Sequence, residues 1–244
     1  MKMYKVSLIL ISLITLAFLL PFFLTSCFGN LVIGSGKVVS EERQVSGISS
    51  ISIGSSMNLF IEQTGSESVR IEADDNIIPY VSTQKIGGEL KIQLKSVSFG
   101  NINPINCYVT VKDLSKIKVS SSATVKCDDL KTENLSIEMA SSSKGTLIVH
   151  VTKLDLNIGS SADLTLSGEA VSQDISLGSS GKLEAYNLVS KDCKIVAQSS
   201  GYANINVSEK LNAQISSSAH VNYKGDPEIN SKISSSGSLN KVSD

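Results

Sequence analysis

The sequence predicts an all-β protein whose body is a right-handed parallel β-helix, or β-solenoid, and three observations lead to this prediction. A motif of one apolar residue, one small or polar residue and two serines recurs along the chain. From Val119 onward, its copies are spaced by 20, 19, 19, 20, 18 and 18 residues. Around each copy, apolar and polar residues alternate, as in a β-strand with one buried face. This period fits one coil of a solenoid and is too short for a helical pair or a propeller blade.

The first residues predict a lipid-anchored protein of the cell envelope. Two lysines precede an apolar run of 19 residues, 6–24, which is the pattern of a secretory signal. The run ends in Leu-Thr-Ser followed by Cys27, which resembles a bacterial lipobox, whose cysteine is lipidated and becomes the mature N-terminus. An uncleaved membrane helix is the alternative, since a run of this length can just span a bilayer. We expect residues 1–26 to be a lipoprotein signal peptide, Cys27 to carry the lipid and residues 27–33 to link it to the body.

Residues 34–100 predict an N-terminal cap of antiparallel strands. Residues 69–73 and 89–95 alternate between apolar and polar, and Gly87-Gly88 is a hairpin-turn dipeptide. Such a cap would cover the open sheet edge at one end of a solenoid. Residues 101–244 predict the solenoid itself, continuous with the cap as one domain. The last residues show no second cap, which leaves two interpretations open: Lys241 blocks this edge, or the uncapped C-terminal end self-associates with another copy of the chain.

Within the solenoid, equivalent residues of successive coils should stack about 4.8 Å apart. We expect the apolar residues two before, six after and eight after each motif start to form buried ladders. The residue four after it is small in every copy except the first, where Met57 stands, so we expect a tight corner there. The third copy breaks the pattern at Lys144 and Gly145, which indicates a bulge or insertion. An antiparallel β-sandwich would explain the alternation but not the constant coil length.

Composition and charge argue against several classes of function. The chain is 41% hydrophobic and 18% charged, too apolar and too weakly charged for a disordered protein. A net charge of −1, with Arg43 and Arg70 as the only arginines, argues against a nucleic-acid partner. Two histidines and four scattered cysteines leave little material for a transition-metal centre. We expect no metal and no cofactor.

An enzyme has to be considered, because parallel solenoids also house polysaccharide lyases and hydrolases. Those chemistries need acids clustered around Ca²⁺ with a basic residue, or paired carboxylates on one face. Asp128-Asp129 is the only adjacent acid pair in the repeats and fits a solvated turn, while His150 and His220 stand at unmatched positions. The acidic run around Asp74 could bind a cation, although an exposed acidic turn is commoner. We predict no enzymatic activity and assign no catalytic residue.

Three cysteines remain once Cys27 is assigned to the lipid. Cys127 and Cys193 occupy positions that are apolar in the other coils, so both are expected in the core. Cys107 and Cys127 are one period apart and could stack closely enough for a disulfide bond, a question that the sequence leaves open.

The serine pairs should stack at one corner as a strip of hydroxyl groups that could bind an ordered polysaccharide. The interpretation that we favour is simpler: the serines turn the corner and hydrogen-bond one another and the backbone. Tyr186, Tyr202 and Tyr223 stand at unrelated offsets, so no aromatic stripe for sugars is expected. The strip comprises Ser121, Ser122, Ser141, Ser142, Ser160, Ser161, Ser179, Ser180, Ser199, Ser200, Ser217 and Ser218.

Three segments of the N-terminal region resemble a known family. They are residues 34–39 (Gly-Ser-Gly-Lys-Val-Val), 45–48 (Val-Ser-Gly-Ile) and 71–80 (Ile-Glu-Ala-Asp-Asp-Asn-Ile-Ile-Pro-Tyr). They look like the putative auto-transporter adhesin, head GIN domain family, and the serine-rich repeats are similar too, so the resemblance covers roughly residues 34–240. The Asp-Asp-Asn run departs from the family's usual Asp-Glu-Asn. The resemblance implies a β-solenoid, commonly a lipoprotein or secreted protein of Bacteroidetes. It also implies adhesion, without an established ligand or catalytic residues.

These observations together predict a non-catalytic lipoprotein that acts as an adhesin or surface scaffold. A carbohydrate-binding module and a polysaccharide lyase or hydrolase of the β-helix type are the alternatives. The expected partners are the membrane, through the N-terminal lipid, and a glycan or a protein of the envelope or host surface. The expected location is the outer membrane, on a side that the sequence leaves open.

Overall fold

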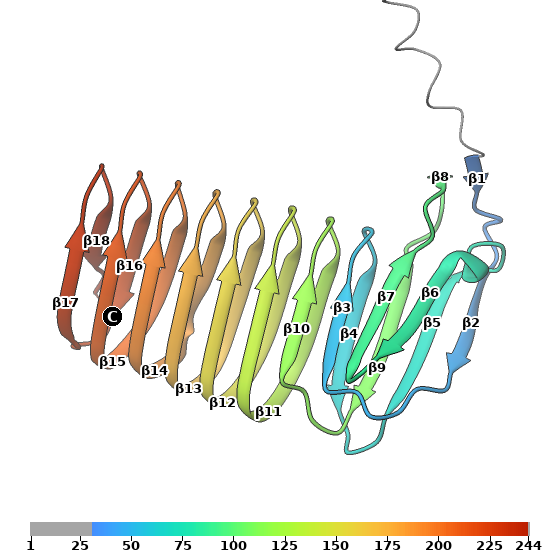
Figure 1. The fold of residues 1–244 in the computed structure, drawn as a ribbon, viewed down its shortest axis with the longest axis horizontal. Coiled ribbons are helices and arrows are strands. Elements are labelled where there is room, and N and C mark those ends of the chain that lie inside the picture. The colour runs from blue at the N-terminus through green and yellow to red at the C-terminus, as the bar shows by residue number, and fades with distance from the viewer. Residues whose placement is uncertain (1–30, 244) are drawn as a thin grey trace, which may run out of the picture.

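The computed structural model describes residues 31–243, which form a β-solenoid closed by a cap at its N-terminal end (Figure 1). The coils follow one another about every 19 residues over about seven turns, which confirms the predicted architecture. The expected signal peptide, Cys27 and the first part of the linker lie outside the described residues. In the part of the chain that is described, no helix is long and apolar enough to cross a membrane.

Long bent strands form the middle of the solenoid. Each one begins after a serine turn, runs along one layer, bends at the opposite edge and returns along the second layer to the next turn (Figure 1). All neighbouring long strands pair in parallel, and the register shifts that occur lie at or near the bends. The long strands are β11 (Thr124–Met139), β12 (Lys144–Ile158), β13 (Asp163–Leu177), β14 (Lys182–Ala197) and β15 (Tyr202–Ile215).

The last coil is made of shorter strands and leaves its outer side open. β16 (His220–Lys224) and β17 (Glu228–Ile233) both pair with β15, and β18 (Ser238–Lys241) pairs with β16. Within residues 31–243, no strand covers the outer side of β17 or β18. All six residues of β17 are exposed as a result.

The N-terminal region contains the first coil as well as the cap. β3 and β4 form this coil on either side of the first serine turn, and the chain then leaves the stack to build the cap before β10 resumes it. One layer of the cap end has the order β6-β7-β3-β10, and the other has β2-β5-β9-β4-β11. The bounds are β1 (Leu31–Ile33), β2 (Val38–Arg43), β3 (Ser50–Ile53), β4 (Asn58–Gln63), β5 (Ser68–Asp74), η2 (Ile78–Tyr80), β6 (Val81–Ile86), β7 (Glu89–Leu94), β8 (Ser98–Gly100), β9 (Asn106–Val111) and β10 (Lys116–Val119).

Antiparallel pairing is confined to this cap. β2 pairs antiparallel with β5, β5 with β9, and β6 with β7. The turn between β6 and β7 is the Gly87-Gly88 hairpin expected from the sequence, and Gly87 has a φ of 61°, which glycine adopts without steric cost.

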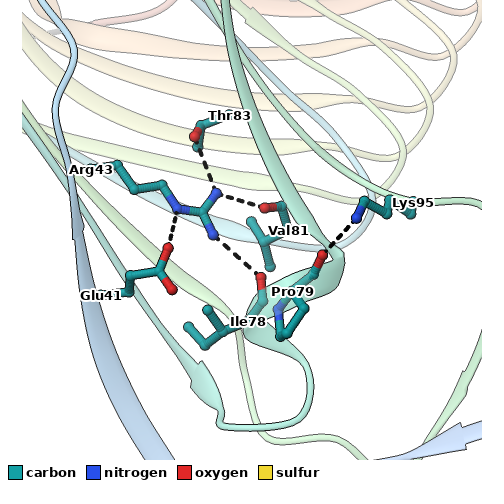
Figure 2. Close-up of polar contacts among 7 residues, drawn as sticks. All are labelled: Glu41, Arg43, Ile78, Pro79, Val81, Thr83 and Lys95. Atoms are coloured by element: carbon teal, nitrogen blue, oxygen red, sulfur yellow. Dashed lines mark hydrogen bonds and ion pairs between the residues drawn. The ribbon is translucent and has the colours of Figure 1, made fainter.

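A half-buried arginine joins the two layers of the cap (Figure 2). The guanidinium group of Arg43, at the end of β2, donates hydrogen bonds to the Val81 carbonyl (2.6 Å), the Thr83 hydroxyl (3.1 Å) and the Ile78 carbonyl (3.3 Å). Its Nε also donates to a carboxylate oxygen of Glu41 at 2.8 Å. Because β2 and β6 belong to opposite layers, Arg43 closes the N-terminal end of the core.

The predicted core ladders are present. The residues two before each motif start pair in register from coil to coil, and they are buried in every copy but the last, where Ser231 is exposed. At the small corner position, a Cβ added to Gly181 would lie 2.6 Å from the Ile158 carbonyl oxygen, so a larger side chain would collide there. The buried residues two before the motif starts are Ile51, Ile117, Ile137, Leu156, Ile175, Ile195 and Ala213.

The bulge expected at Lys144 and Gly145 is wrong. Gly145 pairs in register with Val125 on one side and Leu164 on the other. A side chain is excluded there by two neighbours, because a Cβ at Gly145 would lie 2.8 Å from Leu164 Cδ1 and 3.1 Å from the Met139 sulfur. The side chains of Leu164 and Met139 therefore occupy the space that the glycine leaves.

Candidate functional site

The serine pairs all lie along one edge of the solenoid, where each forms a tight turn (Figure 1). In every pair both serines have φ values between 48° and 62°, in the left-handed region. In the turn at Ser160 and Ser161, the Ala162 N–H donates to the Gly159 carbonyl at 3.0 Å. Two left-handed residues closed by such a bond are the arrangement of a type I′ turn.

Successive turns are joined through the backbone and not through the hydroxyl groups. The N–H of the second serine in one turn donates to the carbonyl of the first serine in the next, as from Ser161 to Ser179 at 3.0 Å. All twelve serines of the predicted strip are exposed. Among the described residues, none of their hydroxyl groups has a hydrogen-bond partner, which differs from the expectation that they bond one another or the backbone. The edge is therefore a row of hydroxyl groups that face solvent.

The charged residues considered for catalysis take part in exposed pairs. Asp129 accepts from the Lys131 ammonium at 2.9 Å, and its other carboxylate oxygen is 3.7 Å from His150 Nε2. His220 lies in a different coil, with its Nδ1 2.7 Å from the Ser238 hydroxyl. Over residues 31–243, no group of three or more histidine, cysteine, aspartate or glutamate residues is placed to hold a metal ion.

All three cysteines of the described region are free and buried. Cys107 pairs in register with Leu59, and Cys127 pairs with Ile61, so strand β4 lies between them. The expectation that Cys107 and Cys127 could stack and form a disulfide is therefore wrong, because the chain leaves the stack between them. Burial raises the pKa of Cys107 and of Cys193 to about 12 and the pKa of Cys127 to about 11, so these thiols are unreactive near neutral pH.

The acidic run around Asp74 fixes the start of the cap. Asp74 is buried and accepts from the backbone N–H and the side-chain amide of Asn103 at 3.0 and 2.7 Å. Asp75 accepts from the Ser35 hydroxyl at 2.7 Å, a bond that lowers the pKa of Asp75. A Cβ at Gly34 would lie 2.2 Å from the Asp74 carboxylate, so the glycine allows this close approach. Two of the segments that carry the family resemblance thus contact each other.

A stack of rings on the outer face of the cap-proximal coils was not anticipated from the sequence. Phe60 on β4 and Tyr108 on β9 are paired in register, with ring centroids 5.0 Å apart and planes inclined by 16°. The guanidinium carbon of Arg70 on β5 lies 4.0 Å from the centroid of the Tyr108 ring. Burial and the nearby Glu72 raise the pKa of Tyr108, so its phenol stays protonated. These residues are distant in sequence, and the insertion of the cap brings them together.

This stack borders an open groove of about 700 Å³. Phe60 and Tyr108 line it from β4 and β9, and charged residues of β11 line it beyond Phe60. Lys126 lies 3.3 Å from Asp128, and the two aspartates of the pair 128–129 each have a lysine partner. Gln63 fixes this part of β11: its side chain donates to the Lys131 carbonyl at 3.0 Å and accepts from the Lys131 N–H at 2.8 Å. The groove combines an aromatic wall with a charged wall.

The stacked coils and the antiparallel cap define a capped parallel β-solenoid with an exposed serine edge. The chain belongs to the family described as putative auto-transporter adhesin, head GIN domain, which matches residues 48–227. This confirms the resemblance drawn from the N-terminal segments. No curated protein matches the chain.

Several solved structures share the fold. A putative adhesin from Bacteroides fragilis NCTC 9343 is 23% identical with a TM-score of 0.78, covering 87% of this chain and 99% of its own. A putative lipid binding protein from Parabacteroides distasonis ATCC 8503 is 24% identical with a TM-score of 0.73, covering 87% and 100%. A putative adhesin from Parabacteroides merdae ATCC 43184 is 19% identical with a TM-score of 0.69, covering 87% and 99%. At these identities the likeness establishes the fold.

Proposed function

We propose that this chain is a non-catalytic cell-envelope lipoprotein that acts as an adhesin or surface scaffold. Membership of an adhesin family indicates a protein of the cell surface or envelope. The observation that carries the proposal is the solenoid itself, a stack of coils that presents one continuous edge of serine turns and is closed by the cap at its N-terminal end.

The position of β1 supports an orientation in which the cap faces the membrane. β1 begins at Leu31 beside the cap, four residues after the proposed lipid attachment site at Cys27. A lipid on Cys27 would place the cap next to the membrane, and the serine edge and the later coils would extend from it. Several acyl chains on one cysteine give stable attachment, where a single chain gives marginal binding.

The body suits a spacer or contact surface because it is regular. From the first serine turn to the last there are seven steps of one coil, which at the spacing of neighbouring strands gives a length of about 34 Å. Each coil contacts its neighbours through backbone ladders and a shared apolar core, so rigidity is distributed along the stack. Such a surface can engage a partner without reorganising, which lowers the entropic cost of binding.

The proposal is tested in cells that carry the full chain or its Cys27→Ala variant. We expect the wild-type chain to incorporate a radiolabelled fatty acid and to fractionate with membranes, and the variant to do neither. Adhesion of these cells to host-cell monolayers should fall to the level of cells lacking the chain when Cys27 is replaced. Equal labelling of both chains would overturn the lipid anchor, and unchanged adhesion on removal of the chain would overturn the adhesin role.

A further inference from the structure

We propose that the groove beside Phe60 binds a neutral saccharide, with the Phe60 ring as the platform for one sugar. This inference rests on the proposed adhesive function, because it names the chemical class of ligand that the surface takes. The serine edge offers hydroxyl groups without an apolar surface, whereas the groove offers an aromatic ring and polar groups together.

Phe60 on β4 is the ring of the stack next to β11, and it lines the groove together with Tyr108. Tyr108 has Phe60 against one face and Arg70 against the other. The next strand beyond Phe60 carries Lys126 in register, and the ammonium of Lys126 lies 3.3 Å from Asp128 on its own strand. Lys126 is therefore held toward Asp128 on its own strand, and Tyr108 and Arg70 occupy the other side of Phe60 in the stack.

A pyranose ring matches these surroundings. The face of an aromatic ring carries negative potential, so it attracts the weakly positive C–H groups that cover one face of a sugar. The hydroxyl groups at the sugar's rim both donate and accept hydrogen bonds. Asp128 and Asp129 supply acceptors, and Lys126 and Lys131 supply donors, at the charged wall of the same groove.

The charges of the groove favour a neutral ligand over an anionic one. Its lining includes the carboxylates of Glu62, Asp128 and Asp129 against the ammonium groups of Lys126 and Lys131. A sulfate, phosphate or uronate group would meet more negative than positive charge there. The volume of about 700 Å³ lies within the range of small-molecule sites and leaves room for a short oligosaccharide.

The walls are held in place before any ligand binds. Phe60 is supported by the stacked Tyr108, and Gln63 ties the end of β4 to β11 through both ends of its amide group. A preformed wall reduces the ordering cost of binding.

The test uses the Phe60→Thr variant, because threonine already occupies this outward position in two later coils, at Thr146 and Thr165. Tyr202→Thr is the matched control, since Tyr202 is an outward aromatic residue outside the groove. Thr124 stands at the equivalent position of an earlier coil, so threonine fits there as well. Residues 28–244 of each protein are passed over immobilised β-glucan, mannan, galactan and chitin fragments, with dextran sulfate and polygalacturonate as anionic probes.

We expect the wild-type chain to be retained by at least one neutral glycan and to bind the anionic probes more weakly. Loss of one aromatic contact should reduce affinity about tenfold in Phe60→Thr, while Tyr202→Thr stays within about twofold of wild type. Phe60→Leu keeps an apolar side chain but lacks the ring, so it should show the same loss with an unchanged melting temperature.

Three results would overturn the assignment: retention of Phe60→Leu and Phe60→Thr equal to wild type, stronger retention on the anionic probes, or no retention on any neutral glycan. The first of these results would leave the adhesive function standing and would mean that the saccharide binds elsewhere on the surface. The proposed function fails separately, if cells without the chain adhere as well as cells that carry it.

Discussion

Each serine turn holds two residues with side chains in a backbone region where a Cβ is crowded against its own chain. Ser160 and Ser161 have φ values of 50° and 60°, and the type I′ turn normally has glycine at the second of these positions. The left-handed conformation costs about 1–2 kcal/mol per residue, whereas glycine adopts it freely but loses about 0.5–1 kcal/mol more backbone entropy on folding.

We therefore expect Ser161→Gly to stabilise the fold by about 0.5 kcal/mol, because the hydroxyl of Ser161 is exposed and has no partner among residues 31–243. Ser161→Val should destabilise it by about 1–2 kcal/mol, since a β-branched residue is least tolerated at positive φ. Urea unfolding of the two variants measures both changes. A valine variant as stable as the glycine variant would contradict the assignment of this turn.

Gln173 is a polar residue in a core ladder. It pairs in register with Leu154 and Cys193 and is 3% exposed, and neither its amide nitrogen nor its amide oxygen has a hydrogen-bond partner among the residues that the structure describes. Burying an unpaired amide costs about 1–3 kcal/mol, and leucine is the residue found at this position in other coils. We expect Gln173→Leu to raise the free energy of unfolding by about 1–3 kcal/mol in thermal or urea denaturation. A destabilised variant would mean that this amide is satisfied in solution.

At the scale of elements, the cap depends on one side chain that reaches from layer to layer. Arg43 links β2 to β6 through the Val81 carbonyl and the Thr83 hydroxyl, and it also donates to the Ile78 carbonyl of η2 (Figure 2). Replacing it with methionine keeps an aliphatic stem but leaves two carbonyl oxygens without this donor.

We expect Arg43→Met to destabilise the protein by about 2–3 kcal/mol, because hydrogen bonds to a charged group in a partly buried site are among the stronger ones. Hydrogen exchange should show that backbone amides lose protection in β2, β5 and β6, while those of β12 and β13 keep theirs. Uniform loss of protection along the solenoid would contradict a local role for Arg43. Arg70→Met is the comparison variant, because half-buried Arg70 on β5 pairs with Glu42 and Glu72 and packs on Tyr108 within its own layer.

The repeats were predictable and the cap only in part, for a physical reason. Each coil packs against its neighbours in the same way, so the period of the sequence predicts the position and register of β11 to β15. The cap strands lie outside this period, and their alternation indicates strands without indicating their order. That order is why Phe60 and Tyr108, which are 48 residues apart, stack, and why Cys107 and Cys127, one period apart, do not. The packing of Met139 and Leu164 over Gly145 could not be predicted from the sequence either, because it depends on residues in neighbouring strands.

At the scale of the whole molecule, the two ends differ. The cap and Arg43 close one end, whereas β17 leaves a row of backbone groups and the side chains of Ile229 and Ile233, 41% and 45% exposed, at the other. Exposed strand edges pair with other chains unless they are blocked. A second copy running antiparallel along β17 would bring Glu228 of one molecule opposite Lys232 of the other and place both isoleucines toward the shared core.

We therefore predict self-association through this end. Sedimentation equilibrium of residues 28–244 should show a concentration-dependent dimer, and the double variant Ile229→Lys with Ile233→Lys should be a monomer. Ile148→Lys is the control, because Ile148 is similarly exposed in the middle of the stack. A wild-type protein that stays monomeric at every concentration would refute this contact.

The central claim is that the capped solenoid is a binding surface without catalytic activity. Its most direct test is to incubate residues 28–244 with a panel of host and envelope polysaccharides and to score retention of the protein and release of fragments in the same samples. The account predicts retention on at least one polymer with no fragments released. Released oligosaccharides would contradict it and mean that the solenoid carries an enzyme.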